Sequence, residues 1–302
     1  MTFTTQIKEE ITKEENNNIE DLTSLCTYLK FNATLEEDKM TVMVVNASVA
    51  RWIFKLLKTN YNVLIKLTTR TMKRFKARNL YILEVKEKLD LIYKDIDNIF
   101  KEISTSSDEE KKAFLKGMFL ACGSINDPKK NQYHLEFLVK EEEDAKLIDD
   151  LLNSLKIKSK VLKRDREYMV YVKSSENISD FIKYLGAFNA LFYFEDIRIY
   201  KDHKNMVNRL NNCEQANVER TLKSSKVILD NIKYLEDNDL LMLLDDRSKE
   251  IIEYKKKYPD TSLGELADII TMETNKSITK SGINHHFRKI NALVKKAKEN
   301  HE

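Results

Sequence analysis

The sequence predicts an α+β fold in which two similar α/β repeats form one N-terminal domain, followed by a helical connector and an all-α C-terminal domain. Two observations predict the duplication: similar short blocks end at residues 35 and 125, and the same order of elements follows each block. A third observation predicts the connector, since the sequence from Arg198 to Leu235 is rich in Asn, Lys and Arg and lacks glycine and proline. We therefore expect repeats at 1–102 and 103–197, a connector at 198–236 and the last domain at 237–302.

The two repeats align through the blocks YLKFNATL (28–35) and MFLACGSI (118–125), which place Asn32 opposite Cys122. Each block is followed by a run typical of a strand, TVMVV or YHLEFLV, and then by a helix with apolar residues three and four positions apart. Two more strands, joined by a basic turn, and a last helix complete each repeat. The sequence therefore predicts the order helix, strand, helix, strand, strand, helix twice. In the first repeat the basic turn holds Lys73, Arg74, Lys76 and Arg78.

The duplicated repeat resembles the LAGLIDADG homing-endonuclease fold, whose two motif helices pack along a pseudo-two-fold axis. In that family each motif helix ends in an acid followed by glycine, and the paired acids hold divalent metal for DNA hydrolysis. A hard cation that bridges phosphate oxygens requires such anionic oxygen ligands. The acid positions fall on Asn32 and Cys122 here, and neither an amide nor a thiol replaces a carboxylate. We therefore expect the scaffold of an endonuclease without its catalytic residues, its metal or any other cofactor.

Other acids do follow the two motif helices. They begin three or more residues beyond the helix ends, in the expected hairpin turns, and should point away from the axis between the helices. The small residues of the second motif helix, such as Gly117, are explained by close helix packing alone. An active site-specific endonuclease is the alternative, and it requires the later acids to rebuild a metal site. These acids are Glu36, Glu37, Asp38 and Asp127.

Positive charge is concentrated in the last part of the chain. The net charge is only +3, yet residues 276–298 hold seven basic residues and no acid, so the rest of the chain carries −4. A basic segment on an otherwise acidic chain is typical of phosphate binding, although a solvated helix face gives the same pattern. The connector is also basic, and we expect it to be helical with an interruption near Asn211–Glu214. It either contacts phosphate, through Lys204, Arg209 and Arg220, or is a solvated linker.

The C-terminal domain has the pattern of a helix-turn-helix. One helix stops at Pro259, and the next begins after Ser262, which forms a capping box with Glu265. Thr279 is a suitable N-cap for the last helix. The apolar residues of that helix recur at the spacing of a single buried face. They are Ile283, Phe287, Ile290 and Val294.

The opposite face of the last helix carries polar and basic side chains suited to DNA. Arg288 can bind guanine O6 and N7, and Asn284 can bind adenine, while residues at the helix start suit phosphate. We therefore predict that this helix enters the major groove; a plain three-helix interaction domain is the alternative. His286 falls beside the apolar face and is expected at the edge of the core. The predicted DNA-binding residues are Lys280, Ser281, Asn284, His285, Arg288 and Lys295.

Four blocks in order along the chain are similar to recurrent blocks of the WhiA family of bacterial sporulation and cell-division regulators. They are FLKGMFLACGSINDPKK, ISDFIKYLGAFNALFYFEDIRI, NMVNRLNNCEQAN and SITKSGINHHFRKI, and the opening MTFTTQIKEEI also resembles that family. Asn32 and Ala33 depart from it, since they replace a small residue and a glycine. The resemblance implies a non-enzymatic, sequence-specific transcription regulator that binds double-stranded DNA and acts in cell division and chromosome segregation.

The N-terminal domain leaves a further alternative open. Its surface, which faces DNA in the endonucleases, can instead sense a small ligand or bind a partner protein such as the transcription machinery. No apolar run is long enough to cross a membrane, and the N-terminus lacks an apolar export segment. The three cysteines are far apart and indicate neither a disulfide framework nor a zinc site. We expect a cytoplasmic, nucleoid-associated protein without membrane contact.

Overall fold

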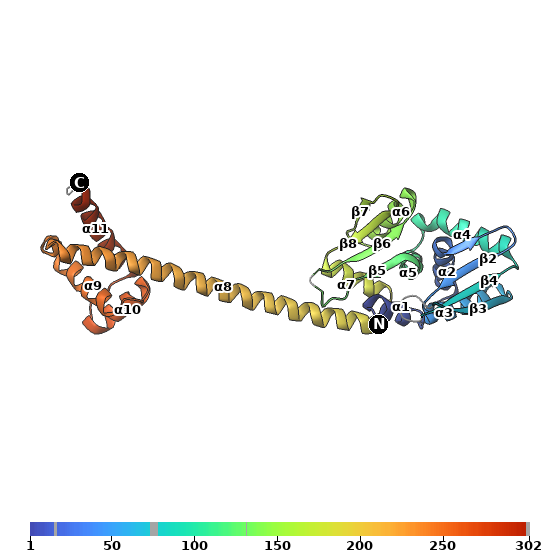
Figure 1. Cartoon of the computed structure of the whole chain (residues 1–302), viewed down its shortest axis with the longest axis horizontal. Helices are drawn as coiled ribbons and strands as arrows, with labels where there is room; N and C mark the ends of the chain where they lie inside the picture. The colour runs from blue at the N-terminus through green and yellow to red at the C-terminus, as the bar shows by residue number, and fades with distance from the viewer. Residues whose placement is uncertain (15–16, 73–77, 131, 300–302) are drawn as a thin grey trace. The chain divides into compact units, whose positions relative to one another are not determined.

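The computed structural model describes residues 1–14, 17–72, 78–130 and 132–299. It contains two compact units, Met1–Asp202 and His203–Glu302. The first unit is a mixed α/β domain with two separate sheets, and the second is entirely helical in its described part (Figure 1). The predicted α+β fold class is therefore confirmed.

The first unit consists of two copies of one pattern, preceded by helix α1 (Phe3–Ile11). The first copy contains α2 (Asn18–Asn32), β1 (Ala33–Leu35), β2 (Met40–Val44), α3 (Ala47–Tyr61), β3 (Ile65–Met72), β4 (Arg78–Val85) and α4 (Leu89–Glu102). The second contains α5 (Asp108–Cys122), β5 (Gly123–Ile125), β6 (Leu135–Val139), α6 (Glu142–Ser154), β7 (Lys160–Lys163), β8 (Tyr168–Val172) and α7 (Ser175–Tyr184). The predicted order of elements is confirmed, with one strand added to each copy.

The added strands, β1 and β5, follow the motif helices directly. Each pairs with the next strand in an antiparallel hairpin, and the two sheets have the matching orders β1-β2-β4-β3 and β5-β6-β8-β7. The sequence did not predict these strands because three residues are too few to show the alternation of a strand. The alignment of the repeats is confirmed, since α2 ends at Asn32 and α5 ends at Cys122.

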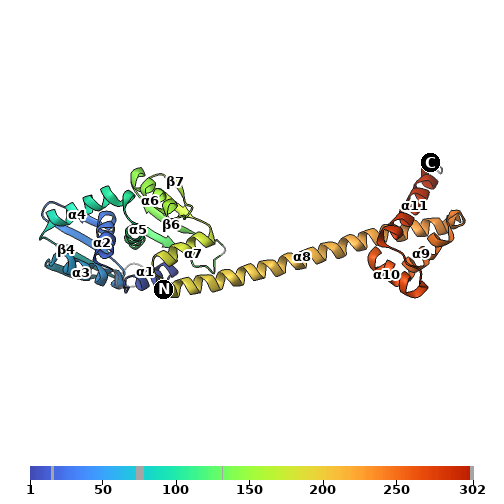
Figure 2. The same cartoon turned by 180° about the vertical axis from the view of Figure 1, so that it is seen from behind.

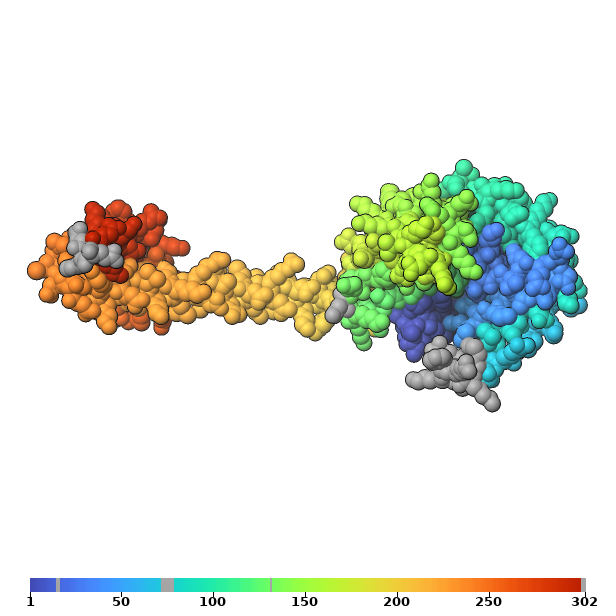
Figure 3. Space-filling model, turned by 45° about the horizontal axis from the view of Figure 1, so that its top comes forward, coloured from blue at the N-terminus to red at the C-terminus, as the bar shows by residue number. Residues whose placement is uncertain are grey.

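The two motif helices, α2 and α5, pack against each other in the middle of the first unit. Ser24 Oγ donates a hydrogen bond of 2.9 Å to the Ala113 carbonyl. A Cβ at Gly117 would lie 2.4 Å from the Ser24 carbonyl oxygen, so only glycine permits this close approach. Figure 3 shows the two copies, blue to cyan and green, packed directly against each other. The close packing of small residues expected from the sequence therefore holds the copies together.

Helix α8 (Phe188–Asp237) is continuous over 50 residues. The predicted interruption near Asn211–Glu214 was wrong. Asparagine and glutamate lower helix propensity only slightly, and the segment has no glycine or proline to end the helix. The start of α8 is capped from a distant element, since the Glu10 carboxylate accepts hydrogen bonds from the Asn189 and Ala190 amides at 2.7 and 3.1 Å.

The second unit packs three helices around the last part of α8 (Figure 2). These are α9 (Asp246–Lys257), α10 (Leu263–Thr274) and α11 (Lys280–Glu299). Their core is separate from the core of the first unit and includes residues that the sequence assigned to the connector, namely Ile228, Ile232 and Leu235. None of the described helices has the length and apolar character needed to span a membrane.

Candidate nucleic-acid interface

The two positions that align with the acids of the endonuclease motif, Asn32 and Cys122, are the last residues of the two motif helices. Asn32 is exposed, and its Nδ2 donates a hydrogen bond to the Tyr28 hydroxyl. Cys122 is half-buried, and its Sγ donates to the Met118 carbonyl oxygen at 3.4 Å. Burial raises the pKa of Cys122 to about 12, so this thiol stays protonated at neutral pH. Neither position supplies an anionic ligand for a hard metal ion.

A lysine also lies close to one of these positions. Lys8 of α1 donates a hydrogen bond of 3.0 Å to the Leu120 carbonyl, near the end of α5, and lies close to Cys122. Burial lowers the pKa of Lys8 to about 8, and its amine still carries a proton for most of the time at pH 7. A cation here opposes the binding of a divalent metal. Lys8 was not among the predicted site residues, because nothing in the sequence shows that α1 packs against α5.

The later acids lie beyond the helix ends, as expected. Glu36, Glu37 and Asp38 are exposed in the turn between β1 and β2. Asp127 follows β5 and accepts hydrogen bonds from the Lys129 amide at 2.9 Å and the Tyr193 hydroxyl at 3.3 Å. Among the described residues, no group of three or more His, Cys, Asp or Glu side chains is placed to hold a metal ion.

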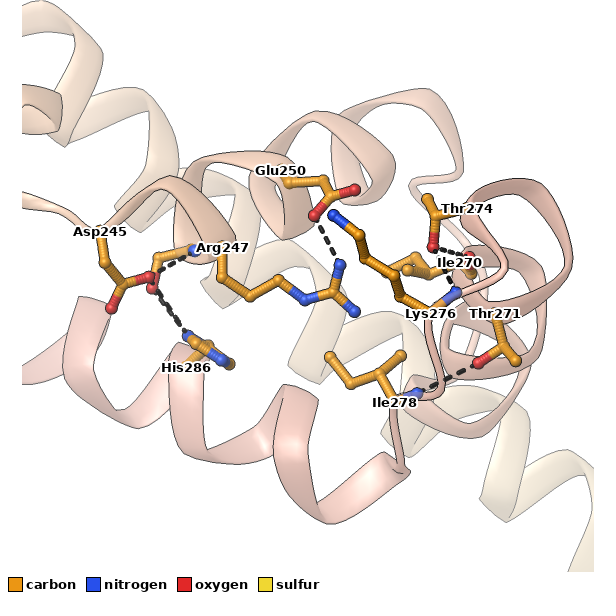
Figure 4. Close-up of polar contacts among 10 residues, drawn as sticks. Asp245, Arg247, Glu250, Ile270, Thr271, Thr274, Lys276, Ile278 and His286 are labelled. Carbon is orange, nitrogen blue, oxygen red and sulfur yellow. Dashed lines mark hydrogen bonds and ion pairs between the residues drawn. The ribbon is translucent and has the colours of Figure 1, made fainter.

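The helix-turn-helix consists of α10, a short turn and α11. Asn275 ends α10 in the left-handed conformation, with a φ of 54°, which asparagine tolerates better than most residues. The Lys276 amide donates to Thr274 Oγ1 at 3.3 Å, and the Ile278 amide donates to Thr271 Oγ1 at 3.2 Å (Figure 4). These local hydrogen bonds fix the direction in which the chain leaves α10 and enters α11.

The predicted N-terminal caps of α10 and α11 are confirmed. Ser262 and Glu265 form both hydrogen bonds of a capping box at the start of α10. Thr279 Oγ1 accepts from the Gly282 amide at 3.2 Å, as an N-cap of α11 should. The expected apolar face of α11 is buried, with exposed fractions of 0–3% for Ile283, Phe287, Ile290 and Val294.

The opposite face of α11 is open to solvent. Ser281, His285, Arg288 and Lys295 are exposed, Lys280 is exposed at the first position of the helix, and Asn284 is half-buried. Lys295 lies 3.9 Å from Glu299, and both side chains are largely exposed, which makes this a weak ion pair. Five of the six predicted residues are therefore exposed on one helix, and Asn284 is partly accessible.

His286 has a different role from its neighbour His285. Its Nδ1 lies 2.8 Å from Ser248 Oγ and 3.8 Å from Asp245 Oδ1, at the start of α9 (Figure 4). Burial lowers the pKa of His286, and Asp245 only partly opposes this effect. The ring is therefore mainly neutral at pH 7 and ties α9 to α11 at the edge of the core, where the sequence placed it. Nothing in the sequence indicated that Ser248 would be the hydrogen-bond partner of His286.

The predicted phosphate contacts of the connector all lie on α8. Lys204, Arg209 and Arg220 are exposed. Arg220 lies near the start of α11, because Arg220 and Lys280 line the same pocket, whereas Lys204 and Arg209 do not contribute to it. The basic turn expected in the first repeat falls largely on residues 73–77, which lie outside the described part of the chain.

Comparison with known proteins identifies the family. The model of the WhiA N-terminal LAGLIDADG-like domain matches residues 19–99, that of the WhiA LAGLIDADG-like domain matches 111–204, and that of the WhiA C-terminal HTH domain matches 207–294. The probable cell division protein WhiA of Oceanobacillus iheyensis is 36% identical over 311 residues, covering 99% of this chain and 98% of that protein. The chain belongs to the WhiA family.

Other members and solved structures agree with this assignment. The probable cell division protein WhiA of Bacillus cytotoxicus is 37% identical, with 98% of this chain and 97% of that protein covered. The crystal structure of full-length WhiA from Thermatoga maritima matches with a TM-score of 0.59 and 22% identity, and covers 98% of this chain and 99% of that one. This match shows that the WhiA-family chain has the expected fold of two LAGLIDADG-like repeats and a helix-turn-helix domain.

Proposed function

We propose that the protein is a sequence-specific transcription regulator that binds double-stranded DNA through its helix-turn-helix and has no enzymatic activity. The observation that carries the proposal is the exposed face of α11. Its predicted DNA-binding residues, including Arg288 and Asn284, lie on the accessible side of a helix that is held rigidly by four buried apolar residues. An α-helix fits the major groove, where arginine and asparagine distinguish guanine and adenine.

Charge supports the same proposal. Residues 276–298 carry seven basic side chains and no acid, and this segment includes α11 from its first residue to Lys298. Within it, Lys280 and Lys295 suit phosphate contacts on either side of the groove, while Arg220 on α8 adds a further cation near Lys280. Cations of this kind supply most of the sequence-independent affinity for DNA. The bases would then be distinguished by Arg288 and Asn284.

The N-terminal unit is proposed to be a catalytically inactive endonuclease scaffold. The support is chemical: Asn32 is neutral, the Cys122 thiol is protonated, and Lys8 places a cation beside the second position. Purified protein should therefore leave bound DNA uncut in the presence of Mg²⁺ or Mn²⁺. Metal-dependent cleavage that disappears in Asp38→Ala or Asp127→Ala would instead support the rival function, a site-specific endonuclease.

The relatives support a role in cell division. Proteins with 36–37% identity to this chain are named probable cell division proteins. We propose that this chain acts in cell division and chromosome segregation from the nucleoid in the cytoplasm. The proposed division of labour assigns residues 1–102 and 103–197 to a scaffold open to a small ligand or the transcription machinery, 198–236 to a connector, and 237–302 to DNA recognition.

Mapping of bound DNA across the genome, followed by footprinting of one site, tests the proposed function. We expect a limited set of enriched sites that share a sequence and lie in promoter regions. The matched control is the Arg288→Ala protein, which should lose enrichment at these sites while it remains folded. Uniform binding along the chromosome, unchanged by this substitution, would contradict sequence-specific regulation.

A further inference from the structure

A pocket of about 180 Å³ lies in the second unit, between α8 and the first residues of α10 and α11. Two cations, Arg220 and Lys280, line it together with several residues that carry hydroxyl groups, among them Ser224 and Ser225. No carboxylate is found among the described residues of this lining. The pocket therefore combines positive charge with hydrogen-bond donors, which is the chemistry that oxyanions require.

A buried lysine lies directly behind this lining. Lys255 of α9 is fully buried, and its Nζ donates hydrogen bonds to Ser225 Oγ at 2.8 Å and to the Thr261 carbonyl at 2.7 Å. Ser225 and Thr261 both line the pocket. Lys255 therefore extends from the core of the unit to the wall of the pocket, where neutral groups accept its hydrogen bonds.

The charge of Lys255 has no direct counterion in the described part of the chain. Its described hydrogen-bond partners are a hydroxyl and a carbonyl, and Asp260 and Glu265 act on it only through weaker, longer-range attraction. Burial accordingly lowers the pKa of Lys255. A buried ammonium without a paired anion is unfavourable, and an anion bound nearby would reduce this cost.

A bound oxyanion would complete this arrangement. It would lie between Arg220 and Lys280, within range of the Lys255 charge, and Ser224 would offer a further hydroxyl donor. Residues at the starts of α10 and α11 line the pocket, and the N-terminal end of a helix carries a positive partial charge. Phosphate fits this site, because it accepts several hydrogen bonds at once and is negatively charged at neutral pH.

We propose that this pocket binds a phosphate group, and that a backbone phosphate of duplex DNA occupies it when α11 lies in the major groove. The inference rests on the proposed function and adds a contact to it. Lys280 belongs both to the pocket and to the start of α11, so the phosphate that it holds is adjacent to the groove that α11 enters. Phosphate contacts of this kind fix the position of a recognition helix without reading sequence.

The first test compares two substitutions on α8 in the full-length protein. Arg220 lines the pocket, whereas Lys226, six residues further on, is exposed about 120° around the helix and does not line it. The probe is a mixed-sequence DNA duplex, titrated across a salt series by fluorescence anisotropy. Arg220→Met should bind about threefold to tenfold more weakly, with a salt slope shallower by about one unit. Lys226→Met should behave as the parent protein does.

The outcomes separate this inference from the proposed function. If the parent protein does not bind the duplex at all, the proposed function fails and this inference fails with it. If the parent binds but Arg220→Met and Lys226→Met have equal affinities and slopes, only the pocket assignment is overturned. Lys255→Met is a second variant that should also weaken binding, with folding checked by circular dichroism. If Lys255→Met does not fold, the comparison of Arg220→Met with Lys226→Met alone decides whether the pocket binds a DNA phosphate.

A further experiment distinguishes binding of a DNA phosphate from binding of free phosphate. Inorganic phosphate should raise the Tm of the parent protein more than chloride does at equal ionic strength, and should not do so for Arg220→Met. It should also compete with the duplex. A phosphate-dependent Tm shift in the parent, combined with equal duplex binding by the parent and Arg220→Met, would overturn the DNA assignment and leave a site for a free phosphate.

Discussion

Polar side chains at the ends of the motif helices differ in their hydrogen bonding from those on the exposed face of α11. At the helix ends, Asn32, Cys122 and Lys8 each donate a hydrogen bond to a nearby group of the first unit. On α11, Arg288 and His285 extend into solvent from a helix whose other side is buried. Polar groups bonded internally serve the fold, whereas exposed groups on a rigid helix remain available to a partner.

This difference shows that the packing of the two motif helices does not depend on the residues at their ends. The close contact of Gly117 with Ser24 depends only on packing, and it holds α2 against α5 whatever residues end those helices. Metal-dependent hydrolysis requires carboxylates at two particular positions, whereas the packing of the helix pair does not depend on them.

The buried side of α11 should control the stability of the whole second unit. Phe287 is 2% exposed and packs in the centre of that core. Phe287→Ala should lower the free energy of unfolding of this unit by about 3–5 kcal/mol and abolish DNA binding through loss of structure. Circular dichroism during thermal unfolding measures the first effect. Met272→Ala, at an 80% exposed position of α10, is the control and should change stability by less than about 0.5 kcal/mol.

The internal position of Lys8 should appear in the pH dependence of the first unit. Its pKa falls from 10.5 to about 8 on folding, so unfolding takes up a proton between these values. The contribution of Lys8 to the free energy of unfolding therefore rises with pH across this window. The stability of the parent relative to Lys8→Met should increase by roughly 2–3 kcal/mol between about pH 7.5 and pH 10.

Fluorescence of Trp52 in urea titrations measures this difference, because Trp52 is the only tryptophan of the chain and is buried in the first unit. Other groups that titrate in the window are present in both proteins, so their contributions largely cancel. Lys55→Met, which removes an exposed lysine of α3, is the control. Parallel pH curves for the parent and Lys8→Met would show that Lys8 is solvated and does not belong to the internally bonded set.

The exposed side of α11 should control sequence preference. Removal of Arg288 or Asn284 should weaken binding to the mapped site by about 1–3 kcal/mol and relax the preference at one base pair. Affinities for this site and for a scrambled duplex, measured over a salt series, separate the two effects. If Arg288→Ala folds normally and still distinguishes the two duplexes as well as the parent, then α11 does not read bases and its face binds another partner.

The smallest effect is expected at Lys295, further along the same face. Its side chain is 80% exposed, and its ion pair with Glu299 is weak. Lys295→Ala should weaken binding to all sequences alike and reduce the salt slope by about one unit. The same titrations measure this change. A loss confined to the mapped site would mean that Lys295 contacts a base edge and not phosphate.

Local chemistry allowed much of the second unit to be predicted. The capping box of Ser262 and Glu265 involves residues three positions apart, and the buried face of α11 follows from a spacing of three and four residues. The repeat in the first unit was also detectable, because both copies preserve the length and order of their elements. The position of Asn32 and Cys122 at the helix ends followed from that alignment.

The sequence by itself therefore determined most of the elements, the duplication and the two faces of α11, since these depend on residues that are close along the chain. Only the tertiary structure decided how distant residues meet. Glu10 caps α8, Lys8 reaches the end of α5, and Lys255 lies behind a pocket that joins Arg220 to Lys280. The positions of these charged groups depend on helix packing, and no periodic pattern along the sequence encodes which helix faces a given lysine or glutamate.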